Sequence, residues 1–390
     1  MSEYVQEKLQ TPVCGHYDVI VVGGGVAGAA AALAAKRAGA RTLLIEKMTI
    51  LGGLATAGHI IYYMTLCDGC GHKVIGGISE ELLRTAIRYG TSDLPPEWVG
   101  GPLRVQTKNR YRTEFNAGAF ALALDELILD TGIDLLLDTV FCAPMIQDGR
   151  CTAVVVENKS GRQAYTCSAV IDASGDADVL ARAGVPCGEQ DNFIAFWGYQ
   201  VDQKDQVRPL KILLIGNNLG SDLPAGSKKY YGTNASQVTD FVIDSHRLAL
   251  NRIKKDRITL ASFPSMPLFR TTRRLCGAYD LTTADLEHTF ADSIGCTGDW
   301  RKAGPIYEIP YRSLYSPLCS NIWAAGRNIS VSGDLWEVTR VIPVAAMTGQ
   351  AAGAAAALAV SQGCPAGQVP VDDLQKMLLE TGVIIHRPER

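Results

Sequence analysis

The stretch DVIVVGGGVAGAAAALAAKRAGARTLLIEK, residues 18–47, decides the fold class of this chain. Residues 18–22 form a β-branched run that ends in glycines, which is typical of a buried parallel strand. Residues 27–38 are dominated by alanine, the strongest helix former, and are closed by Gly39. Residues 41–46 predict the next strand, so the pattern indicates a strand, a turn, a helix and a strand, the opening of an α/β fold.

The glycines of the turn follow the spacing Gly23-x-Gly25-x-x-Gly28, and the acid Glu46 ends the second predicted strand. In this arrangement the first glycine makes the tight turn, the second lets the backbone approach a pyrophosphate, and the third allows close helix packing. The helix N-terminus adds unpaired N–H groups and a positive dipole end. We expect Glu46 to bind ribose hydroxyls and, with Lys47 after it, to favour a free 2′-hydroxyl: FAD or NAD rather than NADP.

Two later segments, residues 171–175 and 322–326, also end in glycine after an apolar run. Residues 141–171 alternate in polarity and contain two polar–glycine turns, which predicts a small antiparallel meander. An alanine-rich helix is predicted over residues 349–358. The chain therefore returns repeatedly to the element type with which it begins.

Residues 191–315 differ in texture, since they are richer in Trp, Tyr, Asn and charge and lack the strand–helix rhythm. One helix is predicted there, over residues 236–255. We therefore expect a Rossmann-like dinucleotide-binding domain with a β-meander, formed by residues 1–190 and 316–390, and an inserted α+β substrate domain at residues 191–315.

Composition excludes several function classes. Hydrophobic residues make up 47% of the 390-residue chain and charged residues 20%, so we expect a sizeable core. A formal net charge of −3 offers no electrostatic footprint for nucleic acid or an anionic membrane. The apolar runs at residues 19–35 and 341–360 contain glycine and much alanine, which favours buried elements over membrane spans. Eleven cysteines without a secreted spacing pattern, and the polar residues 1–11, predict a reduced, cytoplasmic protein.

The chain resembles the glutathione-reductase-like FAD fold over nearly its whole length. The resemblance is carried by residues 21–47, by AVIDASGDADVLARAG at 169–184, and by AAGRN at 324–328 with GQAAGAAAALA at 349–359. A narrower group is indicated by LGGLATAG at 51–58, DGCGHKVIGGISEEL at 68–82, RTTRRLCGAYDLT at 270–282, DSIG at 292–295 and YEIPYRSL at 307–314. This group of FAD-dependent oxidoreductases is related to the flavoprotein subunit of heterodisulfide reductase and, more distantly, to thiazole synthases and fumarate-reductase flavoproteins. The resemblance implies FAD and redox chemistry, and leaves the substrate open.

The resemblance also implies where the cofactor binds. Gly52 and Gly53 are expected near the pyrophosphate and flavin, and Val140 is expected to present backbone groups to the adenine. Gly326-Arg327 stand where many relatives carry Gly-Asp, which leaves the role of Arg327 open. The expected cofactor-binding residues are Gly23, Gly25, Val26, Ala27, Gly28, Glu46, Lys47, Gly52, Gly53, Val140, Ser174, Gly175, Asp176, Gly326, Arg327, Gly349, Gln350 and Ala351.

Two further implications concern the flavin itself. The closing helix is predicted to start at Gly349-Gln350-Ala351, which would bring N–H groups near the flavin C2 carbonyl and stabilise the anionic reduced flavin. His59 follows the Gly-Gly loop, and some fumarate-reductase relatives carry a covalent histidyl flavin, but their motif differs. We therefore expect noncovalent FAD.

Several side chains are candidates for contact with the substrate. Arg340, in EVTRVIPVAAMTGQ, is expected to face the flavin and hold an anionic or carbonyl group of the substrate; the alternative is a salt bridge with Glu337 or Asp334. Tyr307 and Tyr311 stand where the insertion rejoins the FAD domain, so they either line the substrate pocket or are half-buried strand aromatics.

Two clusters have open interpretations. Arg273 and Arg274, with Arg270 nearby, form either an anion clamp for a carboxylated or phosphorylated substrate or a salt-bridge face. Cys67 and Cys70 have the spacing of a redox dithiol or half a metal site. No second Cys-x-x-Cys completes a zinc ribbon, so we expect a structural loop there and no metal.

The sequence contains no second GxGxxG unit for NAD(P)H and no ferredoxin-type cysteine run. Electrons must therefore come from the substrate, a partner, or weakly docked NAD(P)H. We expect hydride transfer between a small organic substrate and flavin N5 in a water-poor cleft between the domains. The alternatives are an electron-transfer flavoprotein subunit working with an iron–sulfur partner, or a flavoprotein with a structural flavin or a macromolecular substrate. Homo-oligomerisation stays open.

Overall fold

The computed structural model describes residues 5–64, 66–92, 94, 112–202, 204, 206–213, 226 and 228–388. The helices are α1 Val26–Arg37, α2 Ile78–Ile87, α3 Ala117–Asp130, α4 Asp178–Arg182, α5 Ala235–Asp256, α6 Leu335–Thr339, α7 Ile342–Gln362 and α8 Val371–Glu380. The strands are β1 Val13–Val22, β2 Thr42–Ile45, β3 Tyr62–Tyr63, β4 Thr113–Glu114, β5 Asp134–Leu136, β6 Val140–Gln147, β7 Arg150–Asn158, β8 Gly161–Asp172, β9 Cys187–Glu189, β10 Ala195–Val201, β11 Val207–Leu213, β12 Thr259–Ser262, β13 Arg273–Leu275, β14 Ser293–Gly298, β15 Ile306–Pro310 and β16 Ile322–Ala324.

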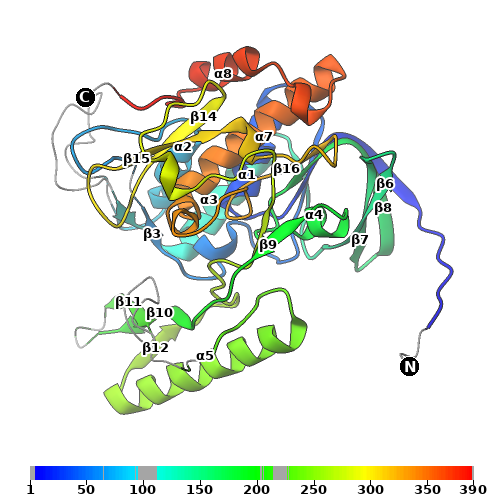
Figure 1. Cartoon of the computed structure of the whole chain (residues 1–390). Coiled ribbons are helices and arrows are strands. Elements are labelled where there is room, and N and C mark those ends of the chain that lie inside the picture. Colours follow the sequence, from blue (N-terminus) through cyan, green and yellow to red (C-terminus); the bar gives the residue numbers. More distant parts are fainter. Residues whose placement is uncertain are drawn as a thin grey trace.

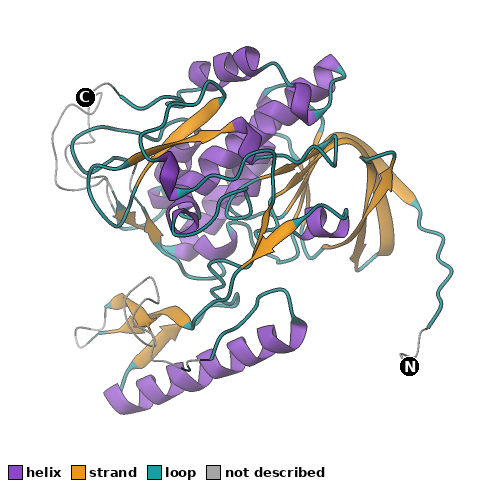
Figure 2. Cartoon of the chain, in the orientation of Figure 1, coloured by secondary structure: helices purple, strands orange, loops and turns teal. Residues whose placement is uncertain are grey.

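A large domain is built on a mixed sheet with the strand order β5-β2-β1-β8-β7-β6, to which β16 is added beside β8. β1 is parallel to both β2 and β8, and β5 and β16 extend this parallel part. β8 changes partner along one edge: residues 161–166 pair with antiparallel β7, and residues 170–172 pair with β16. The predicted α/β fold with a β-meander is confirmed. Strand β8 belongs both to the parallel part of the sheet and to the antiparallel meander β6-β7-β8 (Figure 2).

Helices α1 and α7 pack on each other in the middle of the large domain (Figure 1). Their backbones come close because small residues face one another. A Cβ on Gly349 would lie 2.1 Å from the carbonyl oxygen of Ala27, and a Cβ on Gly353 would lie 2.2 Å from that of Ala31. By length and composition α7 is apolar enough to cross a membrane, but 78% of its apolar window is buried inside the protein. Its place in the core agrees with the buried element expected at residues 341–360.

A smaller lobe lies apart from the large domain (Figure 1). It consists of the three-stranded sheet β11-β10-β12 and the long helix α5. Its own hydrophobic cluster is formed by Ile194, Tyr230, Phe241 and Phe269. All of these elements fall within residues 191–315.

The rest of the predicted insertion packs with the large domain. β13 pairs with β9, and β15 pairs with β14. Side chains such as Leu275, Ile294 and Ile309 belong to the large hydrophobic core. Even before β13 the separation is incomplete, because Ala195, Trp197 and Leu268 belong to the large hydrophobic core. The boundary at residue 315 does not coincide with a break in packing.

Helices α2 and α3 begin at caps of different kinds. α2 has Gly77 as its N-cap, and Ser79 donates from its hydroxyl to the carbonyl oxygen of Pro343 at 2.9 Å. α3 begins after Asn116, whose side chain accepts from Ala119 N at 2.9 Å. Asparagine is among the best N-cap residues, so this cap follows from local chemistry.

Candidate functional site

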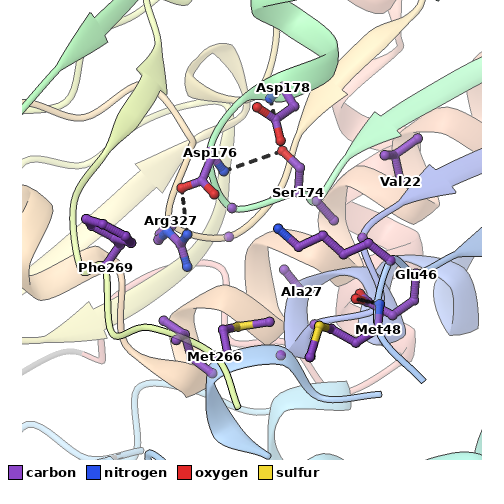
Figure 3. A pocket seen from close by; sticks show the side chains of 18 of the residues that line it. Val22, Ala27, Glu46, Met48, Ser174, Asp176, Asp178, Met266, Phe269 and Arg327 are labelled. Atoms are coloured by element: carbon purple, nitrogen blue, oxygen red, sulfur yellow. Dashed lines mark hydrogen bonds and ion pairs between the residues drawn. The ribbon is translucent and has the colours of Figure 1, made fainter. Parts of the chain in front are cut away.

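A cavity of about 700 Å³ lies between the large domain and the lobe. One wall carries the turns after β1, β2, β8 and β16, and the opposite wall carries lobe-side residues that include Met266, Phe269 and Arg270. Figure 3 shows Glu46 at one end of this space and Phe269 at the other, with Arg327 of the large-domain wall near Phe269. The expected cofactor-binding residues that line it are Gly23, Gly25, Val26, Ala27, Glu46, Lys47, Gly52, Gly53, Val140, Ser174, Gly175, Asp176, Gly326 and Arg327.

The three glycines of the first turn lie in different surroundings. Gly23 has a φ of +104°, and a Cβ there would lie 2.4 Å from the carbonyl oxygen of Ala173. A Cβ on Gly28 would lie 1.7 Å from the carbonyl oxygen of Gly23, so α1 packs on the turn only with glycine at this place. A Cβ on Gly25 would meet no protein atom nearer than the Cα of Gly53, at 3.9 Å, although Gly25 lines the cavity. The fold itself requires the first and third glycines, and the second leaves room for what the cavity holds.

Glu46 is buried at the end of β2 and lines the cavity (Figure 3). Its Oε2 accepts a hydrogen bond from Gly24 N at 2.6 Å, and its Oε1 accepts from Met48 N at 2.8 Å. Burial raises the pKa of this carboxyl, and the two backbone donors act in the opposite direction. A carboxylate offers about four acceptor sites. Glu46 therefore holds the glycine turn in place and keeps acceptor capacity for ribose hydroxyls.

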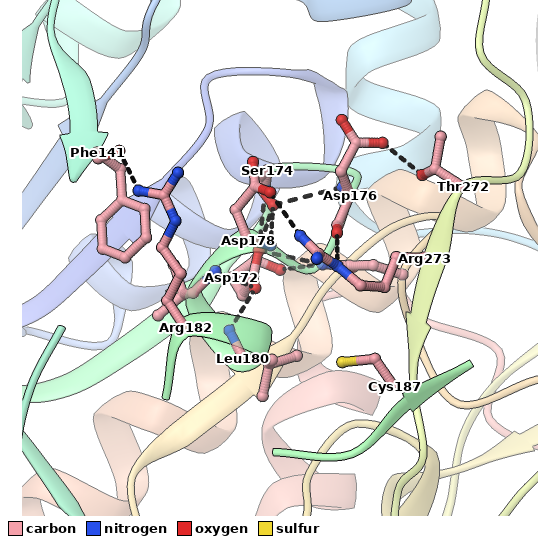
Figure 4. A network of polar contacts seen from close by, with 12 residues as sticks. Phe141, Asp172, Ser174, Asp176, Asp178, Leu180, Arg182, Cys187, Thr272 and Arg273 are labelled. Atoms are coloured by element: carbon pink, nitrogen blue, oxygen red, sulfur yellow. Dashed lines mark hydrogen bonds and ion pairs between the residues drawn. The ribbon is translucent and has the colours of Figure 1, made fainter. Parts of the chain in front are cut away.

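A polar network shapes the turn that follows β8 (Figure 4). Asp172 is fully buried, and its Oδ2 accepts from the backbone N–H groups of Val179 and Leu180 at 2.9 and 3.0 Å. Its Oδ1 accepts from the hydroxyl of Ser174 at 2.6 Å. Burial raises the pKa of Asp172 to about 6, against the effect of these hydrogen bonds. The network fixes the turn at residues 174–176 along the cavity wall.

Asp176 and Arg327 join the turn after β8 to the segment after β16. Arg327 Nη2 lies 2.7 Å from Asp176 Oδ1, and the hydroxyl of Thr272 donates to the same oxygen. Burial alone would raise the pKa of Asp176, but the charge of Arg327 and the hydrogen bond from Thr272 outweigh it and lower this pKa. Arg327 Nε is buried and has no hydrogen-bond partner among the described residues. A charged donor is thus left at the cavity wall.

The predicted helix start at Gly349 is wrong, because α7 begins at Ile342, about two turns earlier. Gly349 packs on α1, and Gln350 Oε1 accepts from Ile78 N at 2.8 Å. Neither these two residues nor Ala351 line the cavity, whereas Ile342 does. Any N–H groups that α7 offers to a flavin therefore belong to its true first turn.

Tyr307 and Tyr311 lie in the hydrophobic core, 3% and 2% exposed, and are not part of the cavity wall. The hydroxyl of Tyr311 donates to the carbonyl oxygen of Ala366 at 2.8 Å and accepts from Trp323 Nε1 at 2.8 Å. Tyr307 belongs to β15. The prediction that these tyrosines line the substrate pocket is therefore wrong: they are strand and turn aromatics, and they are fully buried.

Arg273 and Arg274 do not form a joint anion clamp, because neighbours on a strand point to opposite faces. Arg273 lines the cavity, but its Nη2 pairs with Asp178 Oδ1 at 2.8 Å and its Nε donates to the carbonyl oxygen of Asp176 at 2.8 Å (Figure 4). Arg274 is outside the cavity wall and pairs with Asp280 at 2.7 Å. The salt-bridge alternative describes both residues.

Arg340 lines the cavity and also forms the salt bridge with Glu337, with its Nε 2.8 Å from Glu337 Oε2. The salt bridge to Glu337 and a position at the cavity wall, the two alternatives for Arg340, therefore occur together. Arg270, which the sequence placed only in a general basic cluster, lines the same cavity. It is 7% exposed, and its Nη1 has no hydrogen-bond partner among the described residues.

The loop around Cys67 and Cys70 is held by a buried aspartate. Asp68 accepts from the backbone N–H groups of Cys70 and His72 at 2.7 and 3.1 Å. Both thiols are free, and burial raises the pKa of Cys67 to about 12. Within the described ranges no cluster of His, Cys, Asp or Glu has the arrangement of a metal site.

The cavity suits a dinucleotide such as FAD. The N-cap of α1, Gly25, has no side-chain hydrogen bond, so the first turn keeps N–H groups for an anion. The space beside Gly25 and the unpartnered Nε of Arg327 match a ligand that approaches the backbone closely and accepts hydrogen bonds. His59 lies outside the cavity wall, with its ring packed against that of Tyr199 at a centroid distance of 5.2 Å.

These features define a dinucleotide-binding α/β protein with a lobe over its cofactor cavity. The chain belongs to the FAD dependent oxidoreductase family, whose model matches residues 18–196 and 190–378. The predicted enzyme class, with FAD as its cofactor, is thus confirmed. A curated relative, the tRNA uridine 5-carboxymethylaminomethyl modification enzyme MnmG of Protochlamydia amoebophila (strain UWE25), is 32% identical over 173 residues. That match covers 41% of this chain and 24% of the relative, so the chain spans about a quarter of the relative's length.

Solved structures of similar fold include two that match most of the chain. A geranylgeranyl bacteriochlorophyll reductase-like protein from Thermoplasma acidophilum has 14% identity and a TM-score of 0.45, covering 94% of this chain and 82% of its own. The p-nitrophenol 4-monooxygenase PnpA from Pseudomonas putida DLL-E4 has 12% identity and a TM-score of 0.49, covering 94% and 85%. These likenesses concern the fold alone.

Proposed function

We propose that this oxidoreductase transfers a hydride between a carbon of a small organic substrate and noncovalently bound FAD, in the cavity between the large domain and the lobe. When bound, FAD supplies a carrier for two electrons and a proton. The observation that carries the proposal is a single cavity lined both by the dinucleotide motif and by the lobe-side residues Met266, Phe269 and Arg270.

In this proposal the two walls have separate tasks. The large-domain wall binds and orients the cofactor through the α1 N-terminus, Glu46 and Arg327. The lobe-side wall closes the space next to it with the apolar side chains of Met266 and Phe269, which keeps water away from the reacting atoms.

The test begins with the purified protein, which should be yellow and should release its FAD into the supernatant on acid precipitation. The flavin should then be reduced anaerobically by at least one compound from a panel of small alcohols, amines, hydroxy acids and carboxylic acids, followed by loss of its visible absorption. A flavin that light reduces but no compound reduces, in a preparation that contains a co-purifying iron–sulfur protein, would instead support the electron-transfer subunit.

A further inference from the structure

Arg270 carries a buried charge that its surroundings do not neutralise. The residue is 7% exposed, and its Nη1 has no hydrogen-bond partner within the described part of the chain. Its guanidinium lies over the ring of Phe193, 4.4 Å from the centroid, which is a favourable contact but supplies no counter-ion. Leaving a guanidinium buried without an anion is strongly unfavourable. The cavity that Arg270 lines is the place from which an anion can reach it.

The neighbouring charges add to the unfavourable energy of burying Arg270 without an anion. Burial is the largest effect on Arg270 and, together with the charge of Arg340, it lowers the pKa to about 10, while Glu337 acts in the opposite direction. Glu337 is already bound by Arg340. Two cations and one carboxylate leave a net charge of +1 at this end of the cavity.

The backbone that carries Arg270 is held in place by a buried side chain. Asn192 is 5% exposed, and its Oδ1 accepts from Arg270 N at 2.8 Å and from Thr271 N at 3.1 Å. Its Nδ2 donates to the carbonyl oxygen of Thr271. Asn192 and Arg270 lie on the two chain segments that connect the lobe to the large domain, so this amide fastens both connections together. Arg270 is therefore a positioned group on rigid backbone, as a binding site requires.

Two other arginines of the same cavity are already paired with carboxylates. Arg273 is bound to Asp178, and Arg327 is bound to Asp176. These ion pairs belong to the turn that shapes the cofactor wall. Lys47 and Arg182 also line the cofactor wall without a carboxylate partner among the described residues, but both are exposed to solvent. The buried uncompensated charge therefore lies at the lobe-side end.

We infer that the substrate is a small carboxylate whose anionic group binds Arg270 and Arg340 together at the lobe-side end of the cavity. This inference rests on the proposed function, since it names the substrate class of that same site. A planar carboxylate matches the guanidinium fork with parallel hydrogen bonds. A single negative charge also balances the net charge of +1, which a phosphate dianion exceeds.

The experiment uses the FAD-loaded protein and three carboxylates, acetate, succinate and benzoate, each beside its own amide and beside inorganic phosphate. Binding is read from the change in the visible flavin spectrum and from the rise in melting temperature with ligand concentration. We expect saturable binding of at least one carboxylate, and binding of its amide and of phosphate that is at least tenfold weaker. In Arg270→Gln the carboxylate affinity should fall by about 10- to 100-fold.

Two further variants keep the test decisive. Arg274→Gln is the matched control, because Arg274 pairs with Asp280 outside the cavity wall, and its carboxylate affinity should stay within twofold. Arg270→Lys keeps the positive charge and should recover part of the affinity. Arg270→Gln should also leave the melting temperature of the ligand-free holoprotein unchanged or raised, because it removes an uncompensated buried charge.

The inference is overturned if acids and amides bind equally, if phosphate binds more tightly than every carboxylate, or if none of the carboxylates binds. It is also overturned if Arg270→Gln retains FAD and full carboxylate affinity. Should Arg270→Gln fail to fold, a loss of affinity in Arg270→Lys with normal FAD content supports the site, and unchanged affinity overturns it. Failure of the proposed function would look different: carboxylates would bind, but no compound would reduce the flavin.

Discussion

The charged side chains of the two cavity walls differ in the partners that the protein gives them. On the large-domain wall, Glu46 accepts two backbone hydrogen bonds, and Asp176 is paired with Arg327. On the lobe-side wall, Arg270 is buried with a nitrogen that has no partner among the described residues; near it, Arg340, which ends α6 of the large domain, is bound to Glu337. Each wall has a buried arginine nitrogen without a partner, but Arg327 of the first wall is paired with a carboxylate, whereas Arg270 of the second wall has no carboxylate of its own among the described residues. This difference suits a wall that holds a resident cofactor and a wall that exchanges a substrate.

The largest effect is expected from closing the large-domain wall at Gly25. In Gly25→Val the side chain enters the space that the protein leaves beside α1, so FAD binding should be abolished. The measurement is the ratio of flavin to protein after purification. Gly118→Val is the matched control, because Gly118 lies on the exposed surface of α3. Stoichiometric FAD in Gly25→Val would show that the glycine motif does not hold the cofactor.

The next effect concerns the lobe-side end, through Arg340→Met, which keeps much of the bulk and removes the charge. Flavin reduction by the substrate should slow by roughly 100-fold, since the side chain lines the cavity and would hold the reacting molecule. The melting temperature should fall as well, because Glu337 loses its salt-bridge partner. Glu337→Gln removes the same salt bridge but keeps the charge of Arg340, so it separates the loss of stability from the loss of the cation. A normal reduction rate with lowered stability in Arg340→Met would leave Arg340 a purely structural role.

A smaller effect is expected at the large-domain wall from Glu46→Ala. FAD affinity should weaken by about 1–3 kcal/mol, or about 5- to 150-fold, because charge-assisted hydrogen bonds to the cofactor are lost. The variant also releases Gly24 N and Met48 N, so some of the loss acts through the glycine turn. Titration of the apoprotein with FAD measures the change. Unaltered affinity would mean that Glu46 only supports the turn.

The contrast between the walls also explains what the sequence could predict. The strand–turn–helix unit at residues 18–47 depends on local spacing, so its elements and most of the cofactor residues follow from the motif. The start of α7 was missed although a local signal exists: Pro343 occupies the first turn, where proline is favoured. Arg270 lacked any such signal, because its backbone is held by the side chain of Asn192, 78 residues away in the chain.

Tyr307 and Tyr311 illustrate the same limit. Their position at the junction of the insertion with the FAD domain indicated a pocket, but the chain rejoins the large core before them, at β13. There the hydroxyl of Tyr311 forms hydrogen bonds with Trp323 and Ala366. Which aromatic lines a cavity is settled by long-range packing, and neither periodicity nor spacing encodes it.

The smallest effect should come from Arg273→Gln. This variant tests whether an arginine that already has a carboxylate partner differs in its effect from Arg270, which has none in the described part of the chain. Arg273 and Arg270 are three residues apart and both line the cavity, but Arg273 is bound to Asp178 and to the carbonyl oxygen of Asp176. Its side chain is 19% exposed and that of Asp178 is 36% exposed, so solvent weakens the pair. Removing it should lower the free energy of unfolding by about 1 kcal/mol or less.

FAD content and carboxylate affinity in Arg273→Gln should stay close to those of the unchanged protein, measured by the flavin ratio and by the same spectral titration. The reason is that the variant removes a cation together with its existing partner contact, and so leaves the charge of +1 around Arg270 intact. A loss of carboxylate affinity as large as that in Arg270→Gln would show that the substrate draws on both arginines. The proposed difference between a wall whose charges are paired within the protein and a wall that needs an anionic ligand would then be wrong for Arg273.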